Sequence, residues 1–250
     1  ADGDWLFPEG SVVVKNFSLA NQLVETRFLV RHTTGYWPGY SYAWNAAMND
    51  AQLLTSPEVR NINGQDWEYP VGQCFQCHTQ AAGVILGAEN AQLNKDFLYS
   101  LTGKTSNQIG TLAEIGVLTT DSVITLAEVD RLADPEDSND SLEDRARAYL
   151  HSNCSGCHRP QSTGRSNLDL RYQTAFNDMQ LCGKTAQFGA AGSNDGLLLK
   201  PGDAADSVLI RRVSSLNQQL RMPPAGSAIV DSEAVGLLSD WINSVGQCGS

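Results

Sequence analysis

The sequence predicts a mainly α-helical protein with a β-containing N-terminal part, arranged as two domains. Two Cys-x-x-Cys-His pentapeptides, Cys74–His78 and Cys154–His158, begin 80 residues apart, which favours one pentapeptide in each domain. Short β-branched or alternating segments precede the first pentapeptide. Apolar residues after it recur at three- and four-residue spacing, which is typical of helices.

The domain boundary is expected where the chain becomes polar and contains a proline. The segment 134–140 reads Asp-Pro-Glu-Asp-Ser-Asn-Asp and predicts a linker between an N-terminal domain, 1–133, and a C-terminal domain, 141–250. Fourteen of the nineteen aromatic residues lie before residue 131. Apart from the pentapeptides we find no internal repeat, so the two domains are not expected to be copies of one module.

The N-terminal domain begins with segments that favour strands. Ser11–Phe17 is rich in β-branched residues, and Leu23–Arg31 alternates polar and apolar residues. Ser41–Trp44 is expected to pair back onto them after an aromatic, glycine-containing turn. Two helices are predicted after the first pentapeptide, at 90–101 and 106–118, because apolar residues recur there with helical spacing.

The C-terminal domain has a clearer helical pattern. Ser141 is a suitable N-cap with Asp144 three positions later, and a helix should run from there towards His151 and the second pentapeptide. We expect His151 to face solvent, since histidine often occurs near helix ends. The elements expected next are a turn at 200–203, a helix at 207–212, a Met-Pro-Pro loop at 221–224 and an amphipathic helix at 232–245.

Each pentapeptide is typical of a covalent attachment site for c-type haem. In such a site two thiols bond to the haem and the adjacent histidine binds the iron. One pentapeptide is compatible with half of a zinc site, but two that both end in histidine favour two covalently bound haem c groups. The predicted haem-binding residues are Cys74, Cys77, His78, Cys154, Cys157 and His158.

Met222 is the predicted sixth iron ligand of the second haem. It lies between Arg221 and two prolines, 64 residues after His158, and prolines restrict the conformations of such a loop. The thioether is a soft, neutral donor that raises the reduction potential of haem iron. The alternative is that Met222 is an ordinary core methionine.

The sixth ligand of the first haem is less clearly indicated. His32, at the end of a strand-like segment, is favoured because a second imidazole would give a lower potential than a His/Met iron. Met48 is the main alternative. Lys95 or Lys104 as a ligand, or an open sixth position, are further alternatives.

The two remaining cysteines, Cys182 and Cys248, are expected to form a disulfide in an oxidising compartment. It would close a loop of about 65 residues and stabilise the fold by about 3–4 kcal/mol. Two free thiols are the alternative.

The net charge of −11 and the pI of about 4.7 argue against nucleic acid, whose phosphates need a basic surface. The charge suits a redox carrier whose partner proteins present a basic docking patch. No apolar run is long enough to cross a bilayer. Because c-type haem is attached outside the bacterial cytoplasm, we expect a periplasmic or secreted bacterial protein, present here in a mature or trimmed form.

Residues 138–250 resemble class I cytochromes c. The matching features are Asn153-Cys154-Ser155-Gly156-Cys157-His158, Pro201-Gly202-Asp203 with Ser207, Arg221-Met222-Pro223-Pro224, and the helix that contains Trp241. The resemblance implies a compact α-helical haem domain, here a class I cytochrome c fold, that transfers single electrons.

Almost the whole chain is also similar to a family of bacterial dihaem cytochromes. That similarity rests on Phe7-Pro8-Glu9-Gly10, Lys15-Asn16-Phe17, Glu25-Thr26-Arg27, Gly39-Tyr40-Ser41-Tyr42-Ala43-Trp44-Asn45, Asp50-Ala51, the first pentapeptide with Thr79, Leu86-Gly87 and Gln92-Leu93-Asn94. A dihaem electron-transfer protein is favoured over an enzyme, because the β-like first domain departs from the helical plan of dihaem peroxidases and no acid/base constellation can be picked out in the sequence. The alternatives are a dihaem peroxidase-like enzyme with an open haem, which needs an acid/base residue above the iron, and a binding module that uses its aromatic front domain.

Overall fold

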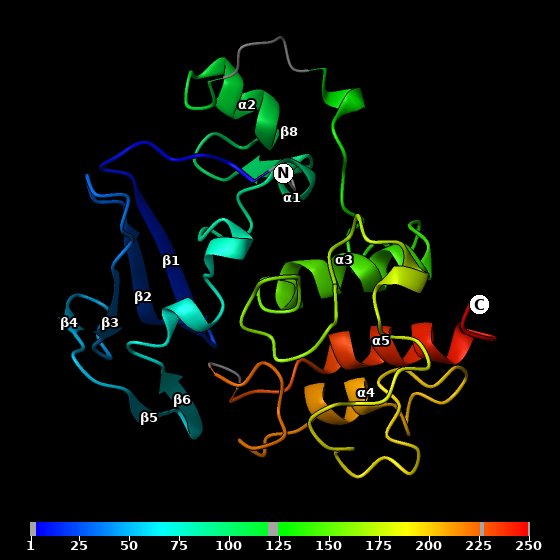
Figure 1. Cartoon of the computed structure of the whole chain (residues 1–250). Coiled ribbons are helices and arrows are strands. Elements are labelled where there is room, and N and C mark those ends of the chain that lie inside the picture. The colour runs from blue at the N-terminus through cyan, green and yellow to red at the C-terminus, as the bar shows by residue number, and fades with distance from the viewer. Residues whose placement is uncertain (1–3, 120–124, 226–227, 250) are drawn as a thin grey trace.

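The computed structural model describes residues 4–119, 125–225 and 228–249. The protein is 23% helical and 21% strand, so the prediction of a mainly α-helical fold was wrong. Strands dominate the N-terminal half, and the longest helices lie in the C-terminal half (Figure 1). The strands expected before the first pentapeptide and the helices expected after residue 140 are present in that order. The helices after the first pentapeptide are much shorter than expected, and strands lie at Asp96–Tyr99 and Lys104–Asn107.

A four-stranded antiparallel sheet forms the N-terminal part. Its strands follow one another in space in chain order and are β1 (Val12–Leu19), β2 (Gln22–Val30), β3 (Gly39–Trp44) and β4 (Ala51–Leu53). Ala20 and Asn21 join β1 to β2 with positive φ angles of 47° and 65°, as a tight hairpin turn requires. The strands predicted near 11–17, 23–31 and 41–44 are therefore confirmed.

Two separate hairpins accompany this sheet. The strands of the first are β5 (Glu58–Ile62) and β6 (Gln65–Tyr69), and those of the second are β7 (Asp96–Tyr99) and β8 (Lys104–Asn107). Asn63 and Gly64 connect β5 to β6 with φ angles of 53° and 86°, which is the conformation that an Asn-Gly turn favours. The first pentapeptide follows shortly after β6.

The prediction of two helices after the first pentapeptide, at 90–101 and 106–118, was mostly wrong. The first is only α1 (Asn90–Leu93) and continues into strand β7, and the second is only α2 (Gln108–Glu114). Asn94 ends α1, since its side chain donates hydrogen bonds to the carbonyl oxygens of Leu126 (3.2 Å) and Val129 (2.8 Å). These contacts between distant residues outweigh the local helical spacing.

The helical part of the fold is the C-terminal half. It contains α3 (Leu142–Cys154), α4 (Val208–Val213) and α5 (Ser232–Ser244). Short 3₁₀ turns lie at Cys74–Gln76, Gln80–Ala82, Leu126–Glu128 and Phe176–Asp178. The side chain of Ser141 accepts a hydrogen bond from the Asp144 backbone N–H at 3.1 Å, which confirms the predicted cap of α3.

The largest core lies between α3, α4, α5 and the long loop that precedes α4. Leu150, Leu199, Leu238, Trp241 and Ile242 are among its fully buried side chains. They come from segments far apart in the sequence, so this core forms only when α3 and α5 pack together (Figure 1).

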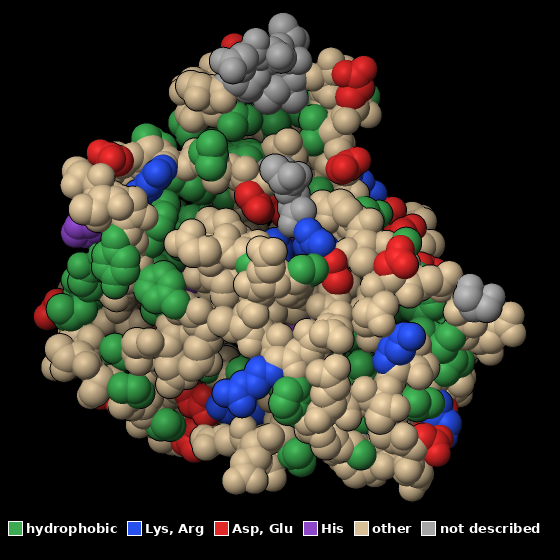
Figure 2. Space-filling model, in the orientation of Figure 1, with side chains coloured by type: hydrophobic (Ala, Val, Ile, Leu, Met, Phe, Trp, Pro, Cys, Tyr) green, Lys and Arg blue, Asp and Glu red, His purple; other side chains and the backbone are tan. Residues whose placement is uncertain are grey.

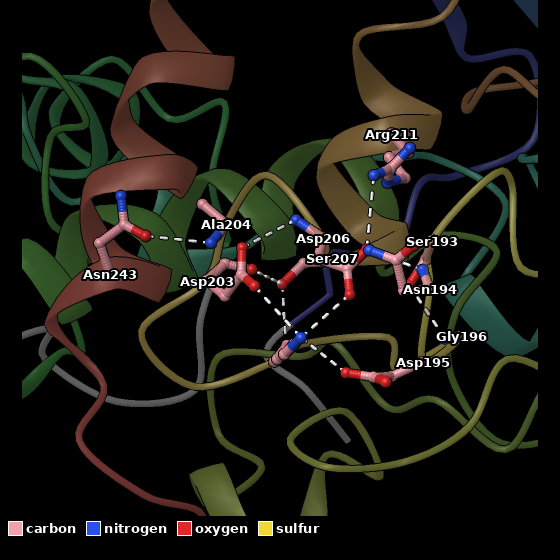
Figure 3. Close-up of polar contacts among 11 residues, drawn as sticks. Ser193, Asn194, Asp195, Gly196, Asp203, Ala204, Asp206, Ser207, Arg211 and Asn243 are labelled. Atoms are coloured by element: carbon pink, nitrogen blue, oxygen red, sulfur yellow. Dashed lines mark hydrogen bonds and ion pairs between the residues drawn. The ribbon is translucent and has the colours of Figure 1, made fainter.

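The long loop is held by a cluster of charges that includes Asp195, Asp203 and Asp206, which point toward one ammonium group (Figure 3). The Lys200 ammonium lies 2.6 Å from Asp195, 3.0 Å from Asp206 and 3.2 Å from Asp203. Hydrogen bonds, the largest from the Asn194 backbone N–H, hold the pKa of Asp206 near 2. The ammonium occupies the centre of the carboxylates, and no described group of three or more His, Cys, Asp or Glu is placed to hold a metal ion.

Cys182 and Cys248 are joined by a disulfide that spans 66 residues. It connects the C-terminal end of the chain to the segment before the Lys200 loop. The expected linker 134–140 consists of ordered turns, with Arg131 bound to Asp140 at 3.0 Å and Arg145 bound to the Pro135 carbonyl at 2.8 Å. The segment 134–140 is therefore bonded both to Arg131, which precedes it, and to Arg145, which follows it.

Candidate functional site

Each Cys-x-x-Cys-His pentapeptide forms a single helical turn. The backbone N–H of His78 donates to the Cys74 carbonyl at 3.0 Å, and that of His158 donates to the Cys154 carbonyl at 2.9 Å. This i to i+4 closure brings the thiols and the histidine of one pentapeptide to the same side of the turn. The cysteines of both pentapeptides carry free thiols.

His78 is oriented through its Nδ1 atom. Nδ1 lies 2.7 Å from the carbonyl oxygen of Val84, which can only accept, so Nδ1 carries the proton and Nε2 keeps its lone pair. Burial is the main cause that lowers the pKa of His78 and so favours the neutral ring. A neutral histidine with one nitrogen fixed by a carbonyl is the usual form of an iron or zinc ligand.

His158 is also hydrogen-bonded through Nδ1, but its partner is a hydroxyl, which can donate or accept. Its Nδ1 lies 3.2 Å from the Ser166 hydroxyl, and burial, helped by the charge of Arg212, lowers its pKa. The chain passes so close to the ring that a Cβ on Gly164 would lie 3.0 Å from Nδ1 and would overlap the Cys157 backbone. A glycine is therefore required at position 164.

The two pentapeptides lie against each other, although 80 residues separate them in the sequence. The Cys157 thiol donates to the Gln76 carbonyl at 3.1 Å, and the Thr79 hydroxyl donates to the Gly156 carbonyl at 3.3 Å. A hydrogen bond with Cys77 is the main cause that lowers the pKa of the Cys157 thiol to about 6 and raises that of Cys77. The second cysteines of the two pentapeptides are thus neighbours.

Buried polar groups reinforce this contact. The Arg159 guanidinium donates to the Ala81 carbonyl at 3.3 Å and to the Ser155 carbonyl at 2.6 Å. His151 is only 2% exposed and its Nε2 is hydrogen-bonded to the Glu89 carboxylate. The prediction that His151 faces solvent was wrong, because α3 turns this residue towards the N-terminal half. The signal in the sequence was its helical spacing, three residues after the apolar Ala148.

The sheet approaches the first pentapeptide at the start of β3. A Cβ on Gly39 would lie 2.8 Å from the Cys74 sulfur, and the ring of Tyr36 stacks with that of Phe75 at 6.5 Å. His32 belongs to the same turn, since its backbone N–H donates to the Tyr36 carbonyl at 2.9 Å. The imidazole of His32 is exposed, in a turn beside the first pentapeptide.

Met48 lies at the other end of the sheet. Its sulfur accepts a hydrogen bond from the Leu23 backbone N–H at 3.3 Å, and the side chain is 47% exposed. The length of β3 separates Met48 from Gly39 and Cys74, about 17 Å at the usual rise per residue of a strand. Lys95 and Lys104, the other suggested ligands, are exposed on the second hairpin and its approach.

Two cations face the first pentapeptide from the sheet. Lys15 on β1 and Arg27 on β2 are direct cross-strand partners, and both lie against the ring of Phe17. Arg27 is paired with the fully buried Glu25 at 2.6 Å, whereas no carboxylate among the described residues pairs with Lys15. The charges of Lys15 and Arg27 add to the effect of burial in lowering the pKa of His78.

Met222 lies half-buried in the loop before α5. Its backbone N–H donates to the Arg212 carbonyl at 3.0 Å, and the Arg212 guanidinium donates to the Leu220 carbonyl at 3.1 Å. Arg212 is also the residue whose charge acts on His158. The Met222 loop and the second pentapeptide are therefore both close to Arg212.

The donor set fits covalently bound haem. Each half supplies two free thiols and a histidine whose Nδ1 is hydrogen-bonded, which leaves Nε2 as the ring nitrogen that would bind iron. Gly39 and Gly164 leave space where a larger residue would press on a sulfur or on an imidazole.

A family model described as Planctomycete cytochrome C matches residues 154–226. The match begins at Cys154 and includes His158 and Met222. Searches of curated proteins and of solved structures found no match. Residues 154–226 are thus a cytochrome c-type region, which suggests a haem-based role in electron transfer and implies covalently bound haem c. Such proteins typically function outside the cytoplasm, and none of the described helices is long and apolar enough to cross a membrane.

Proposed function

Starting from this cytochrome c-type region, we propose that the chain is a dihaem c-type cytochrome that passes single electrons between redox partners in the periplasm or outside the cell. The observation that carries the proposal is the contact between the pentapeptides, with Cys157 bonded to the Gln76 carbonyl at 3.1 Å. A second pentapeptide of this form, held against the first, has no role in a single-haem carrier.

The residues have defined roles in this proposal. Cys74 and Cys77 hold one haem and Cys154 and Cys157 the other, in two thioether pairs. His78 and His158 bind iron through Nε2, because Val84 and Ser166 occupy their Nδ1 atoms. The haem groups supply iron that changes reversibly between the ferric and ferrous states.

We assign Met222 to the second iron and His32 to the first as sixth ligands. Met222 is supported by its place in the matched region and by the link of its loop to Arg212. His32 is supported by its turn, which lies beside Cys74, whereas the Met48 sulfur is hydrogen-bonded at the far end of β3. A His/His and a His/Met iron would give the two haems different potentials and so a direction to internal electron transfer.

The contact between Cys77 and Cys157 defines the internal path. Cys77 would hold one haem and Cys157 the other, and the two thiols lie close enough to affect each other's pKa. Electron tunnelling weakens steeply with distance, and a path through adjoining pentapeptides is short. The Thr79, Gly156 and Gln76 hydrogen bonds keep this separation fixed.

The partners are proposed to be redox proteins with a basic docking patch. The net charge of −11 supports long-range attraction to such a patch. Acidic side chains are distributed over the face shown in Figure 2. A groove of about 690 Å³ between α3 and α5 is lined by Arg145 and by five carboxylates, those of Asp134, Glu136, Asp231, Glu233 and Asp240.

The alternative, a dihaem peroxidase-like enzyme, needs a proton donor or acceptor that is available above an open iron. Glu89 and His151 are the buried acid and base near both pentapeptides, but they are bonded to each other, and His151 Nδ1 accepts from the Tyr172 backbone N–H at 3.0 Å. Rapid cyanide binding with peroxide turnover would favour the enzyme.

The proposal is tested by counting haems on the full chain, produced in a host that matures c-type cytochromes. The wild type should carry two covalent haems. The double variants Cys74→Ala/Cys77→Ala and Cys154→Ala/Cys157→Ala should each carry one, and the control Cys182→Ala/Cys248→Ala should retain two. A wild type with a single covalent haem contradicts the dihaem proposal.

A further inference from the structure

Arg221, the residue before Met222, is a buried cation bound to the other half of the chain. Its side chain is 6% exposed, and its Nη2 donates to the Glu68 carboxylate at 2.6 Å. Glu68 lies on β6, 153 residues earlier in the sequence. The loop that carries the proposed sixth ligand is thus anchored to the N-terminal hairpin.

Glu68 is the main partner of this guanidinium. The only other hydrogen bond of Nη2 among the described residues is a long one, 3.5 Å, to the Pro224 carbonyl, and Nε is buried without a partner. A buried cation without its carboxylate is strongly unfavourable, so removal of Glu68 would displace Arg221 towards water. Met222 is the next residue and would move with it.

The hairpin that carries Glu68 is firmly attached to the N-terminal half. Glu68 pairs with Val59 across the hairpin, and the indole of the adjacent Trp67 donates to the buried Glu25 at 3.2 Å. The first pentapeptide begins five residues after β6 ends. The segment that presents the first haem site therefore also holds the Met222 loop.

Within the C-terminal half, the described contacts of Arg221 and Met222 that hold this loop are made by their backbone N–H groups, beside the Arg212 guanidinium on the Leu220 carbonyl. The Arg221 backbone N–H donates to the Asn217 carbonyl at 2.8 Å, and the Met222 backbone N–H donates to the Arg212 carbonyl at 3.0 Å. These bonds position the main chain but do not hold the Arg221 side chain.

We infer that Glu68 and Arg221 are positioning residues through which the N-terminal half keeps Met222 on the second iron. The inference rests on the proposed function, because it assumes that Met222 is the sixth ligand. The position of the N-terminal hairpin would then affect the ligation of the second iron. Displacing the hairpin would remove the Met222 sulfur from that iron and lower its reduction potential.

The test uses the full dihaem chain and the variant Glu68→Gln, which removes the charge and keeps the shape. Added imidazole competes with the methionine sulfur for ferric iron, and the far-red charge-transfer band of a His/Met haem reports how much sulfur remains bound. We expect Glu68→Gln to lower the imidazole concentration at half-loss of this band at least tenfold, and to lower the midpoint potential of the second haem.

Glu58→Gln is the matched control. Glu58 lies on the same hairpin and is ion-paired with Arg60, and none of its described contacts reaches the C-terminal half. It should leave both the band and the potential at wild-type values. Equal imidazole midpoints for wild type, Glu58→Gln and Glu68→Gln would overturn the inference.

Two further variants keep the test decisive. If Glu68→Gln does not accumulate as a dihaem protein, Arg221→Lys keeps the charge and loses the planar guanidinium, and it should give an intermediate imidazole midpoint. An unchanged midpoint in Arg221→Lys would then overturn the inference. Met222→Ala distinguishes failure of the proposed function from failure of this inference. If the far-red band survives in that variant, Met222 is not the sixth ligand, whatever the result for Glu68→Gln.

Discussion

The buried pair His151–Glu89 allows a prediction about how strongly the two halves are joined. Tyr172 donates its backbone N–H to His151 Nδ1, so the neutral ring donates through Nε2 to Glu89. The side chains of His151 and Glu89 are only 1% and 3% exposed. His151→Ala therefore removes a hydrogen bond to a charged group and leaves a buried carboxylate and a buried N–H without this partner.

The magnitude follows from these two losses. A hydrogen bond to a charged group contributes about 1.5–3 kcal/mol, and each buried group left unsatisfied costs about 1–3 kcal/mol. Because Glu89 also receives a bond from Gln92 at 2.8 Å, we expect a net loss of about 3–4 kcal/mol. Such a loss is a large fraction of the usual stability of a domain, about 5–15 kcal/mol.

Urea unfolding of the haem-loaded chain, followed by circular dichroism and by haem absorbance, measures this loss. Arg131→Ala is the control, because it breaks an ion pair with Asp140 in which the Arg131 side chain is 48% exposed, and it should cost less than about 1 kcal/mol. If His151→Ala costs no more than Arg131→Ala, the pair does not join the halves and this reasoning is refuted.

Further predictions concern the haem sites and the disulfide. Met222→Ala should abolish the far-red His/Met band and leave the first haem spectrum unchanged; a persistent band rejects Met222 as the ligand. Lys15→Gln removes a positive charge near His78 and should lower the first haem potential by tens of millivolts, roughly the Coulomb effect of a unit charge about 10 Å away. Spectroelectrochemistry measures this potential, and an unchanged value would contradict the prediction. Gly39→Ala places a methyl group 2.8 Å from the Cys74 sulfur and should destabilise the protein by about 1–3 kcal/mol, measured by urea unfolding, with reduced haem attachment measured by mass spectrometry; normal loading and stability count against that contact. Cys182→Ser should lower the stability by about 4 kcal/mol on the chain-entropy model for a 66-residue loop, and thermal unfolding under oxidising and reducing conditions tests it, since the variant should match the reduced wild type.

Local sequence pattern predicted the elements that local forces determine. The β-branched residues of Ser11–Phe17 indicated β1, the alternation in Leu23–Arg31 indicated β2, and the cap at Ser141 indicated the start of α3. Both signals are contained within about ten residues. The arrangement of thiols and histidine within each pentapeptide was equally predictable, because hydrogen bonds within the Cys-x-x-Cys-His turn determine it.

The parts that sequence did not predict depend on distant partners. Asn94 ends α1 by binding carbonyls more than thirty residues away, so helical spacing over 90–101 was misleading. Nothing near Glu68 in the sequence indicates Arg221, and nothing near His151 indicates Glu89. The contact between the pentapeptides is of the same kind, since it results from the docking of two halves.

That contact also constrains the order in which the protein is made. In the folded chain Cys77 and Cys157 lie beside each other. Across the same junction, the Thr163 hydroxyl donates to the Gln76 carbonyl and the Thr79 hydroxyl donates to the Gly156 carbonyl. On the dihaem proposal, each of these thiols has to be reached when it is joined to haem. We therefore expect haem to be added before the two halves close against each other.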